Sequence, residues 1–378
     1  MIYFDHNATT PVLPEVRAVV EEAMESYWGN PSSIHCCGRK AFAELERARE
    51  RVAGLINASA DEIYFTSGGT ESDNLALFGI MNLHSDKEMV YSAIEHPAVM
   101  APALHLQSLG RKCHAIEVDN SGIINTTVLS EKINKNTCLV SVMAANNEIG
   151  TLQPIDEIGE IVSAGANAVF HCDAVQALGK IPLDVKRSKI DLLSLSSHKV
   201  NGPKGVGVLY VRRGIKIDPI FFGGHQERNI RPGTQNLPAV LGFVTAAEIC
   251  CNRMKENSEK LFSLTEYMYS RIVAEINEVI RNGDSGRRIP GTINLSFSGV
   301  ETQVLVAALD QEGICISGGS ACQSGSVDPS AVVLALGRRY QEAACAVRFS
   351  LGFSNTKEEV DDCIDSLKNV VERIRGHN

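Results

Sequence analysis

The length, composition and charge of this chain describe a globular protein with room for two domains. Its 378 residues are 44% hydrophobic and 21% charged, and its formal net charge is −9. This acidic balance disfavours nucleic acid or an anionic membrane as the main partner, and no apolar run reaches the roughly 18 residues of a membrane span. The N-terminal sequence MIYFDHNATTP carries no secretory signal, so we expect a cytoplasmic protein.

Helical and strand-like segments alternate through the first part of the chain. The segment KAFAELERARERVAGLI predicts a helix with Leu45, Ala48, Val52 and Leu55 on one face. Beyond it, the apolar segments EIYF, EMVYSAI, KCHAIEV, TCLVSVMAA, NAVFHCD, IDLLSLSS and GVGVLYV read as buried strands. The segments TESDNLALFGIMNL and IDEIGEIVSAG between them have helical spacing. This alternation predicts an α/β fold with a mostly parallel sheet that helices cover on both faces.

The later part of the chain predicts a second, smaller α/β unit. A helical stretch at about residues 239–278 shows no strand signal, and we expect it to link the two units. It is followed by GTINLSFSG, by QVLVAALDQEGICIS, and by a final helix with Val360, Ile364, Leu367 and Val371 on one face. We therefore expect a large domain at residues 15–255 and a small domain formed by residues 1–14 and 256–378.

Polar clusters follow several of the predicted strands. They are TSGGTESDN, EHPAV, NNEIG, DAVQ and SSHKVNGPKG. Because sites in open α/β sheets form at the carboxyl ends of strands, these clusters predict a site in the large domain.

Three of these clusters each allow a functional and a structural interpretation. Gly68, Gly69 and Thr70 open a helix whose N-terminus would bind phosphate, or would only be capped. Lys199 closes a buried strand, where desolvation would suit it to Schiff-base chemistry, although most loop lysines are solvated surface groups. Asp173 needs a cationic partner, which could be a protonated pyridine nitrogen or an ordinary ion pair. Together, the functional alternatives would supply a full set of contacts for pyridoxal phosphate.

The cysteines are mostly expected to be small buried hydrophobic residues. The chain has 11 cysteines without CxxC spacing, which disfavours a zinc ribbon or a thioredoxin-like motif. Cys322 differs because the small residues of ISGGSACQSGS could not pack a core around it. We predict no metal site, since the histidines have no ligand spacing, and only Cys36 and Cys37 beside His35 leave one open.

A series of segments, in order along nearly the whole chain, resembles the cysteine desulfurases of the NifS/IscS type. These enzymes belong to the aminotransferase class V family of fold-type I pyridoxal phosphate enzymes. The matching segments are YFDHNATTPV, WGNPSSIH, FTSGGTESDNLA, EHPAV, NNEIGTLQPI, HCDAVQALGKIPLDV, SSHKVNGPKGVGVLYV, RPGTQN, SGGSACQSG and VRFSLG. The resemblance implies a seven-stranded-type sheet in the large domain, pyridoxal 5′-phosphate as cofactor, L-cysteine as substrate, and a homodimer.

The resemblance also implies a role for each matching residue. Catalysis would rest on Cys322, Lys199 and His96. Cofactor contacts would come from Gly69, Thr70, His96, Asn147, Asp173, Gln176, Ser196, His198 and Lys199, with Thr234 reaching the phosphate of the other subunit. The substrate would contact Arg348, Asn147 and Asn30.

In the mechanism that the resemblance implies, a cysteine of the enzyme receives the sulfur of the substrate. Lys199 would remove the α-proton of the substrate, and Cys322 would take its sulfur as a persulfide while alanine leaves. The sulfur would pass to an acceptor such as an iron–sulfur scaffold, or to tRNA thiolation. Selenocysteine lyase or aminotransferase activity, and a non-catalytic scaffold of the same fold, are the alternatives.

Overall fold

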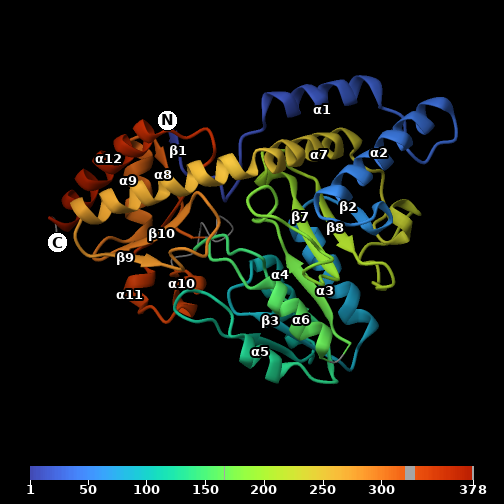
Figure 1. Cartoon of the computed structure of the whole chain (residues 1–378), viewed down its shortest axis with the longest axis horizontal. Helices are drawn as coiled ribbons and strands as arrows, with labels where there is room; N and C mark the ends of the chain where they lie inside the picture. The colour runs from blue at the N-terminus through green and yellow to red at the C-terminus, as the bar shows by residue number, and fades with distance from the viewer. Residues whose placement is uncertain (166, 320–327, 377–378) are drawn as a thin grey trace.

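The largest sheet of the protein has seven strands in the order β2-β8-β7-β6-β5-β3-β4 (Figure 1). The structure is a computed structural model, which describes residues 1–165, 167–319 and 328–376. The strands, in sheet order, are β2 (Ile63–Thr66), β8 (Gly207–Val211), β7 (Leu192–Ser196), β6 (Val169–Asp173), β5 (Thr137–Ser141), β3 (Glu88–Ser92) and β4 (Cys113–Ile116). Neighbours run parallel except at β8, which is antiparallel to both β2 and β7. The prediction of a mostly parallel sheet is confirmed.

Helices cover both faces of this sheet. Successive side chains of a strand point to opposite faces, so apolar side chains on each face need a separate layer of helices to bury them. Val140 belongs to one apolar cluster together with side chains of α1 (Pro14–Ser26), α2 (Cys36–Leu55), α6 (Ile155–Ala164) and α7 (Leu237–Asn252). Its neighbour Leu139 belongs to a second cluster with α3 (Gly69–Leu83) and α4 (Pro97–Ser108). The predicted amphipathic helix is α2, and its expected face points into the first cluster. The short helix α5 (Thr126–Lys132) follows β4.

A second region of the molecule is built on two small sheets. An antiparallel sheet has the order β12 (Ala346–Ser350), β10 (Thr292–Phe297) and β9 (Val279–Asn282). In the other sheet, β1 (Ile2–Tyr3) runs parallel to β11 (Ile314–Cys315). Side chains of α8 (Met254–Glu275), α9 (Thr302–Gln311) and α12 (Lys357–Arg375) form one core with these sheets, and Phe4 joins it from the N-terminal end. The short helices α10 (Ala331–Ala335) and α11 (Tyr340–Ala343) complete the region.

The predicted helical stretch at residues 239–278 consists of two helices, α7 and α8, with Arg253 between them. In Figure 1 they follow one another from the large sheet to the small sheets. Since α7 belongs to the core of the large sheet and α8 to that of the small sheets, we propose the domain division given above. Within the described ranges, no helix is long and apolar enough to cross a membrane.

Candidate active site

The carboxyl ends of β2, β3, β5, β6 and β7 lie at one edge of the large sheet, because these strands run in the same direction. The polar clusters of the sequence follow these ends. β6 ends at Asp173, β7 leads into the short helix Ser197–Lys199, and β3 leads to His96 at the start of α4. The sheet therefore assembles the predicted site residues from positions far apart in the sequence.

Asp173 lies in the interior of this site and is 5% exposed. Its Oδ1 accepts a hydrogen bond of 2.9 Å from the backbone N–H of Val175. Burial, and next the charge of Asp73, raise the pKa of Asp173 to about 7, while His96 acts in the opposite direction. A carboxylate this deeply buried stays ionised only beside a cation. The site is thus suited to a ligand that brings a positive charge to Asp173.

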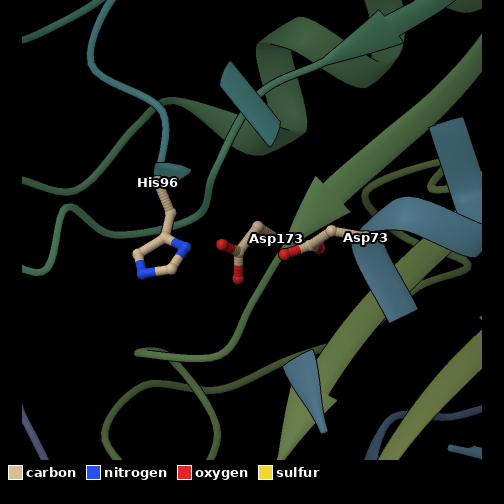
Figure 2. A group of neighbouring side chains, drawn as sticks. All are labelled: Asp73, His96 and Asp173. Carbon is tan, nitrogen blue, oxygen red and sulfur yellow. The ribbon is translucent and has the colours of Figure 1, made fainter. Parts of the chain in front are cut away.

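His96 is the neighbour of Asp173 on the opposite side from Asp73 (Figure 2). One ring nitrogen of His96 and one oxygen from each aspartate lie within 4.8 Å of one another. The Nδ1 atom of His96 accepts a hydrogen bond of 3.1 Å from the N–H of Ala98 and so caps α4. Because Nδ1 accepts, the neutral ring carries its proton on Nε2. His96 can therefore donate a hydrogen bond from Nε2.

Lys199 is held by the N-terminal segment of the chain. Its Nζ donates hydrogen bonds of 2.6 Å and 2.7 Å to the carbonyl oxygens of Asn7 and Ala8. The preceding His198 makes a 3.2 Å contact from Nδ1 to the hydroxyl of Thr9. Burial, and next the charge of Lys199, lower the pKa of His198 to about 4, so its ring is neutral at neutral pH. The amine of Lys199 is therefore anchored, half-buried, at the end of β7.

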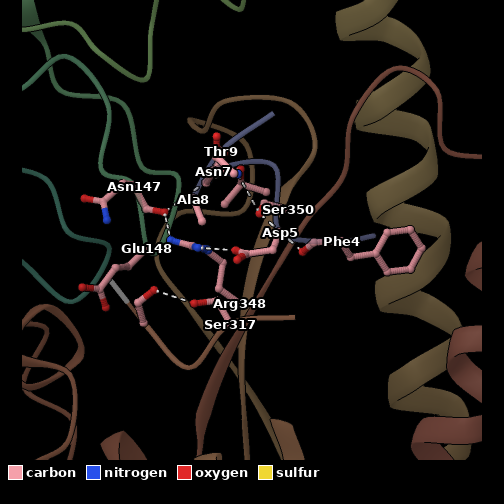
Figure 3. Close-up of polar contacts among 12 residues, drawn as sticks. Phe4, Asp5, Asn7, Ala8, Thr9, Asn147, Glu148, Ser317, Arg348 and Ser350 are labelled. Atoms are coloured by element: carbon pink, nitrogen blue, oxygen red, sulfur yellow. Dashed lines mark hydrogen bonds and ion pairs between the residues drawn. The ribbon is translucent and has the colours of Figure 1, made fainter. Parts of the chain in front are cut away.

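Arg348 extends from β12 toward the loop that follows β5 (Figure 3). Its Nη1 donates a 2.9 Å hydrogen bond to the carbonyl oxygen of Asn147, and its Nη2 lies 2.5 Å from Oδ1 of Asp5. The residue is 1% exposed, and its Nε has no hydrogen-bond partner among the described residues. A guanidinium in this position can bind a carboxylate through two parallel hydrogen bonds.

Asn7 connects these groups, although no motif in the sequence analysis assigned it a role. Its carbonyl oxygen accepts from Gln176 Nε2 at 2.9 Å as well as from Lys199, and its Nδ2 donates to the carbonyl of Asn147 at 3.2 Å. Lys180 donates to Oδ1 of Asn7 at 3.1 Å and to Oε1 of Gln176 at 2.7 Å. Burial, and next the charges of Lys199 and Arg348, lower the pKa of Lys180 to about 7. Asn7 and Lys180 lie in the segments YFDHNATTPV and QALGKI, which match the family pattern. That match was the one sequence feature that pointed to them, and it assigned neither residue a role.

The start of α3 forms a cradle of backbone atoms. Gly68 precedes the helix, and a Cβ atom on Gly207 would lie 2.7 Å from the Cα atom of Gly68. A Cβ atom on Gly69 would lie 2.8 Å from Cγ2 of Val175 and 3.6 Å from Cβ of Ser196. The unpaired N–H groups of a helix start favour a phosphate. The cradle fits a phosphate group beside Ser196, and alanine at Gly69 would require the Val175 side chain to shift.

Two of the predicted residues are exposed side chains and not members of the buried group at the strand ends. Thr234 is exposed in the segment before α7, and Asn30 is exposed in the loop between α1 and α2, where its Oδ1 accepts from the N–H of Ser32 at 2.9 Å. In Figure 1 that loop lies at the side of the molecule away from the small sheets. Cys322 lies outside the described residues.

The sequence left open a metal site at His35, Cys36 and Cys37, and in the structure these side chains make other contacts. The thiols of Cys36 and Cys37 lie 3.9 Å apart, and Nδ1 of His35 accepts from the N–H of Gly38 as the cap of α2. Among the described residues, these three do not form a group of ligand atoms close enough to hold a metal ion.

The donor set at the strand ends fits pyridoxal phosphate. Asp173 is a buried carboxylate that needs a cation, Lys199 supplies an anchored amine, and the cradle at Gly69 suits a phosphate. A pyridinium nitrogen, an aldehyde and a phosphate are the three groups that this cofactor presents.

Comparison with known proteins gives a consistent result along the whole chain. The aminotransferase class-V family matches residues 2–363. The cysteine desulfurase IscS of Dictyoglomus turgidum is 41% identical over 376 residues, which cover 99% of this chain and 95% of that protein. Cysteine desulfurase IscS 1 of Archaeoglobus fulgidus is 42% identical over 378 residues, which cover 100% and 98%.

Solved structures share the fold at similar coverage. A NifS-like protein superimposes with a TM-score of 0.93 and 34% identity, covering 98% of this chain and 99% of its own. The structure of SspA in complex with cysteine has a TM-score of 0.82 and 34% identity, covering 94% and 100%.

Proposed function

The chain belongs to the aminotransferase class-V family and is a pyridoxal phosphate-dependent cysteine desulfurase, and we propose that the residues at the strand ends carry this activity together with Cys322. The single observation that supports this assignment best is the meeting of Asp173, His96 and Lys199 at one edge of the large sheet. The relative solved in complex with cysteine supports L-cysteine as the substrate.

Each part of the cofactor has a proposed partner in this chain. Lys199 would hold the aldehyde carbon, Asp173 would pair with the ring nitrogen, and His96 would stack on the ring. Further cofactor contacts are proposed from Gly69, Thr70, Asn147, Gln176, Ser196 and His198. When bound, pyridoxal phosphate supplies an electron sink for the bonds at the α-carbon of the substrate.

Arg348 is proposed to bind the carboxylate of L-cysteine. The carboxylate of Asp5 already lies 2.5 Å from its Nη2, which shows that this side of the guanidinium accepts an anion. The substrate carboxylate would replace Asp5 there and would also reach Nε, which has no partner among the described residues. Asn147 and Asn30 are the other proposed substrate contacts.

Proton transfer is proposed for two side chains. Lys199 removes the α-proton, and the carbonyls of Asn7 and Ala8 orient its amine. His96 relays a proton through Nε2, since its Nδ1 is engaged with Ala98.

The sulfur step is proposed to occur at Cys322. The Cys322 thiolate attacks the sulfur of L-cysteine, the substrate Cβ–S bond breaks, and the electron pair of that bond stays with the carbon, which is protonated to give L-alanine. The cysteine sulfur becomes the terminal atom of a persulfide on Cys322. A thiol of an acceptor protein, such as an iron–sulfur scaffold, then takes this atom. We place this activity in the cytoplasm and in a homodimer in which Thr234 contacts the phosphate of the other subunit.

Product analysis of the purified protein tests the proposed function. With L-cysteine and a reducing thiol, the holoenzyme should form L-alanine and sulfide in equal amounts. The Lys199→Ala variant should form neither and should lose the absorbance of the lysine-bound cofactor. Alanine formation by this variant, or an unchanged absorbance spectrum, would show that Lys199 does not hold the cofactor.

A further inference from the structure

Asp73, which the sequence did not single out, lies directly behind Asp173. It is in α3 and is 1% exposed. Figure 2 shows its carboxylate directed at that of Asp173, on the side away from His96. The approach is close, because one oxygen from each aspartate and a nitrogen of His96 lie within 4.8 Å of one another. Asp173 is thus placed between an imidazole and a second carboxylate.

Among the described residues, the groups that face Asp73 supply no permanent positive charge. His171 on β6 has its Nε2 3.4 Å from Oδ1 of Asp73, but burial lowers the pKa of His171 to about 4. Its ring nitrogens contact the hydroxyls of Ser141 at 2.9 Å and Ser194 at 3.1 Å. Oδ1 of Asp73 has no hydrogen-bond partner among the described residues.

Glu95 adds a third buried acid to the same region. It is 2% exposed, and its Oε1 accepts a 2.7 Å hydrogen bond from the N–H of Met143. Burial, and next the charge of Asp173, raise the pKa of Glu95 well above its ordinary value. Glu95 therefore belongs to the same buried acidic region as Asp73 and Asp173.

The two aspartates are too close to ionise independently without a ligand. Burial raises the pKa of Asp73 to about 6, while hydrogen bonding with Ser194 and the charge of His96 act against this effect. The pKa of Asp173 is raised to about 7 by burial and by Asp73. Two carboxylates in a shared buried site behave as one titrating pair, whose last proton is held more tightly than that of an isolated carboxylate.

We propose that Asp73 is a positioning residue that acts through Asp173 to keep the ring nitrogen of the bound cofactor protonated. A proton that the two aspartates share without cofactor would pass to the ring nitrogen on binding of the cofactor. Both carboxylates then carry a negative charge, with one N–H⁺ beside them, and the total number of protons is unchanged. The second negative charge makes loss of the proton from the ring nitrogen less favourable. The inference rests on the proposed contact between Asp173 and this nitrogen.

The test is to titrate the ring nitrogen in the holoenzyme. The cofactor is isotope-labelled at this nitrogen, and its NMR shift is followed against pH in wild type, Asp73→Asn and Asp173→Asn. The Asp73→Asn variant keeps the shape of the side chain and removes its charge. We expect it to lower the pKa of the ring nitrogen by about one or more. Asp73→Glu, which restores the charge, should recover most of the wild-type value.

A matched control removes another buried carboxylate of the same sheet. Asp191 is 6% exposed, and it accepts from the N–H of Phe170 at 2.8 Å and pairs with Arg212. Asp191→Asn should cost stability without moving the pKa of the ring nitrogen. If Asp191→Asn and Asp73→Asn change the pKa of the ring nitrogen equally, the effect of Asp73→Asn is general structural damage, and the inference is overturned.

The remaining outcomes separate this inference from the proposed function. If Asp173→Asn leaves the ring nitrogen as in the wild type, the assignment of Asp173 itself fails. If Asp173→Asn lowers its pKa and Asp73→Asn does not, only the role of Asp73 is overturned. A wild-type ring nitrogen that is unprotonated at neutral pH would overturn it without any variant, so the test does not depend on the folding of Asp73→Asn.

Discussion

The side-chain amine of Lys199 lies 2.6 Å from the backbone carbonyl oxygen of Asn7, although 192 residues separate them in the sequence. The side chain of Asn7 continues this connection, since its Nδ2 donates to Asn147 and to Thr292 Oγ1 at 2.9 Å. Through Asn7, the end of β7, the loop after β5 and the strand β10 are fixed to one another. The N-terminal segment is therefore part of the candidate active site as well as of the fold.

Removing the side chain of Asn7 should weaken both the fold and the site. Asn7→Ala leaves buried partners on Asn147, Thr292 and Lys180 without their hydrogen bonds, which should lower the free energy of unfolding by about 1–3 kcal/mol. Alanine formation should fall as well, because the carbonyl that orients Lys199 is no longer held in place. Urea unfolding and steady-state kinetics measure the two effects.

Asn134→Ala is a suitable control for this change. Asn134 is exposed, and its side chain makes only local hydrogen bonds, to Lys132 and Asn136. The Asn134→Ala variant should form alanine with the same steady-state kinetics as the wild type. Wild-type stability and activity in Asn7→Ala would contradict the connecting role of Asn7.

Much of this arrangement follows from local sequence patterns. The strands of the large sheet are short apolar runs, and polar clusters follow them, so both the sheet and the edge that carries the site were predictable. The helix α4 was not predicted, since Pro102 lies inside it and its apolar residues show little periodicity. Asp73 looked like an ordinary helix residue, because its burial arises only when α3 packs on the sheet. The pairing of β1 with β11 is a long-range contact that no local pattern encodes.

Arg348→Lys should impair substrate binding while leaving the cofactor in place. Lysine supplies one charged donor group, whereas the guanidinium binds a carboxylate through two directed bonds. We expect KM for L-cysteine to rise roughly tenfold or more, with an unchanged absorbance spectrum of the cofactor. Arg339→Lys is the matched control, because Arg339 is an exposed residue of the same region that pairs with Glu342. Equal KM values in the two variants would argue against Arg348 as the carboxylate ligand.

Lys180 should impose a pH dependence on stability. Its pKa is about 7 in the folded protein, below the ordinary value of 10.5, so the unfolded chain holds a proton that the folded chain has lost between these values. The free energy of unfolding contributed by Lys180 should therefore rise with pH in this window, by roughly 1.4 kcal/mol per pH unit. Lys180→Met should remove this slope. Urea unfolding of both proteins at about pH 7, 8 and 9 measures the difference, and parallel pH profiles would show that Lys180 is not buried as a neutral amine.

Cys322 should be required for sulfur transfer and not for cofactor binding. Cys322→Ser should retain the cofactor spectrum and lose sulfide release from L-cysteine, because no thiolate attacks the substrate sulfur. Cys36→Ser, which changes an exposed thiol at the start of α2, should keep full activity. Assaying selenocysteine in parallel distinguishes the alternative activity, since a selenocysteine lyase would remain active without Cys322. Normal sulfide release by Cys322→Ser would contradict the persulfide mechanism.

A subunit-mixing experiment should decide whether Thr234 serves the site of the other subunit. Thr234 is exposed in the segment before α7. In a mixed dimer of Lys199→Ala and Thr234→Ala chains, contact across the interface would leave one site with both defects and the other with neither. The dimer should then show about half of the wild-type kcat with a wild-type KM, since one of two sites is intact. If Thr234 acted within its own chain, the remaining active site would carry the Thr234→Ala defect, and the mixed dimer would show the lower activity of that variant.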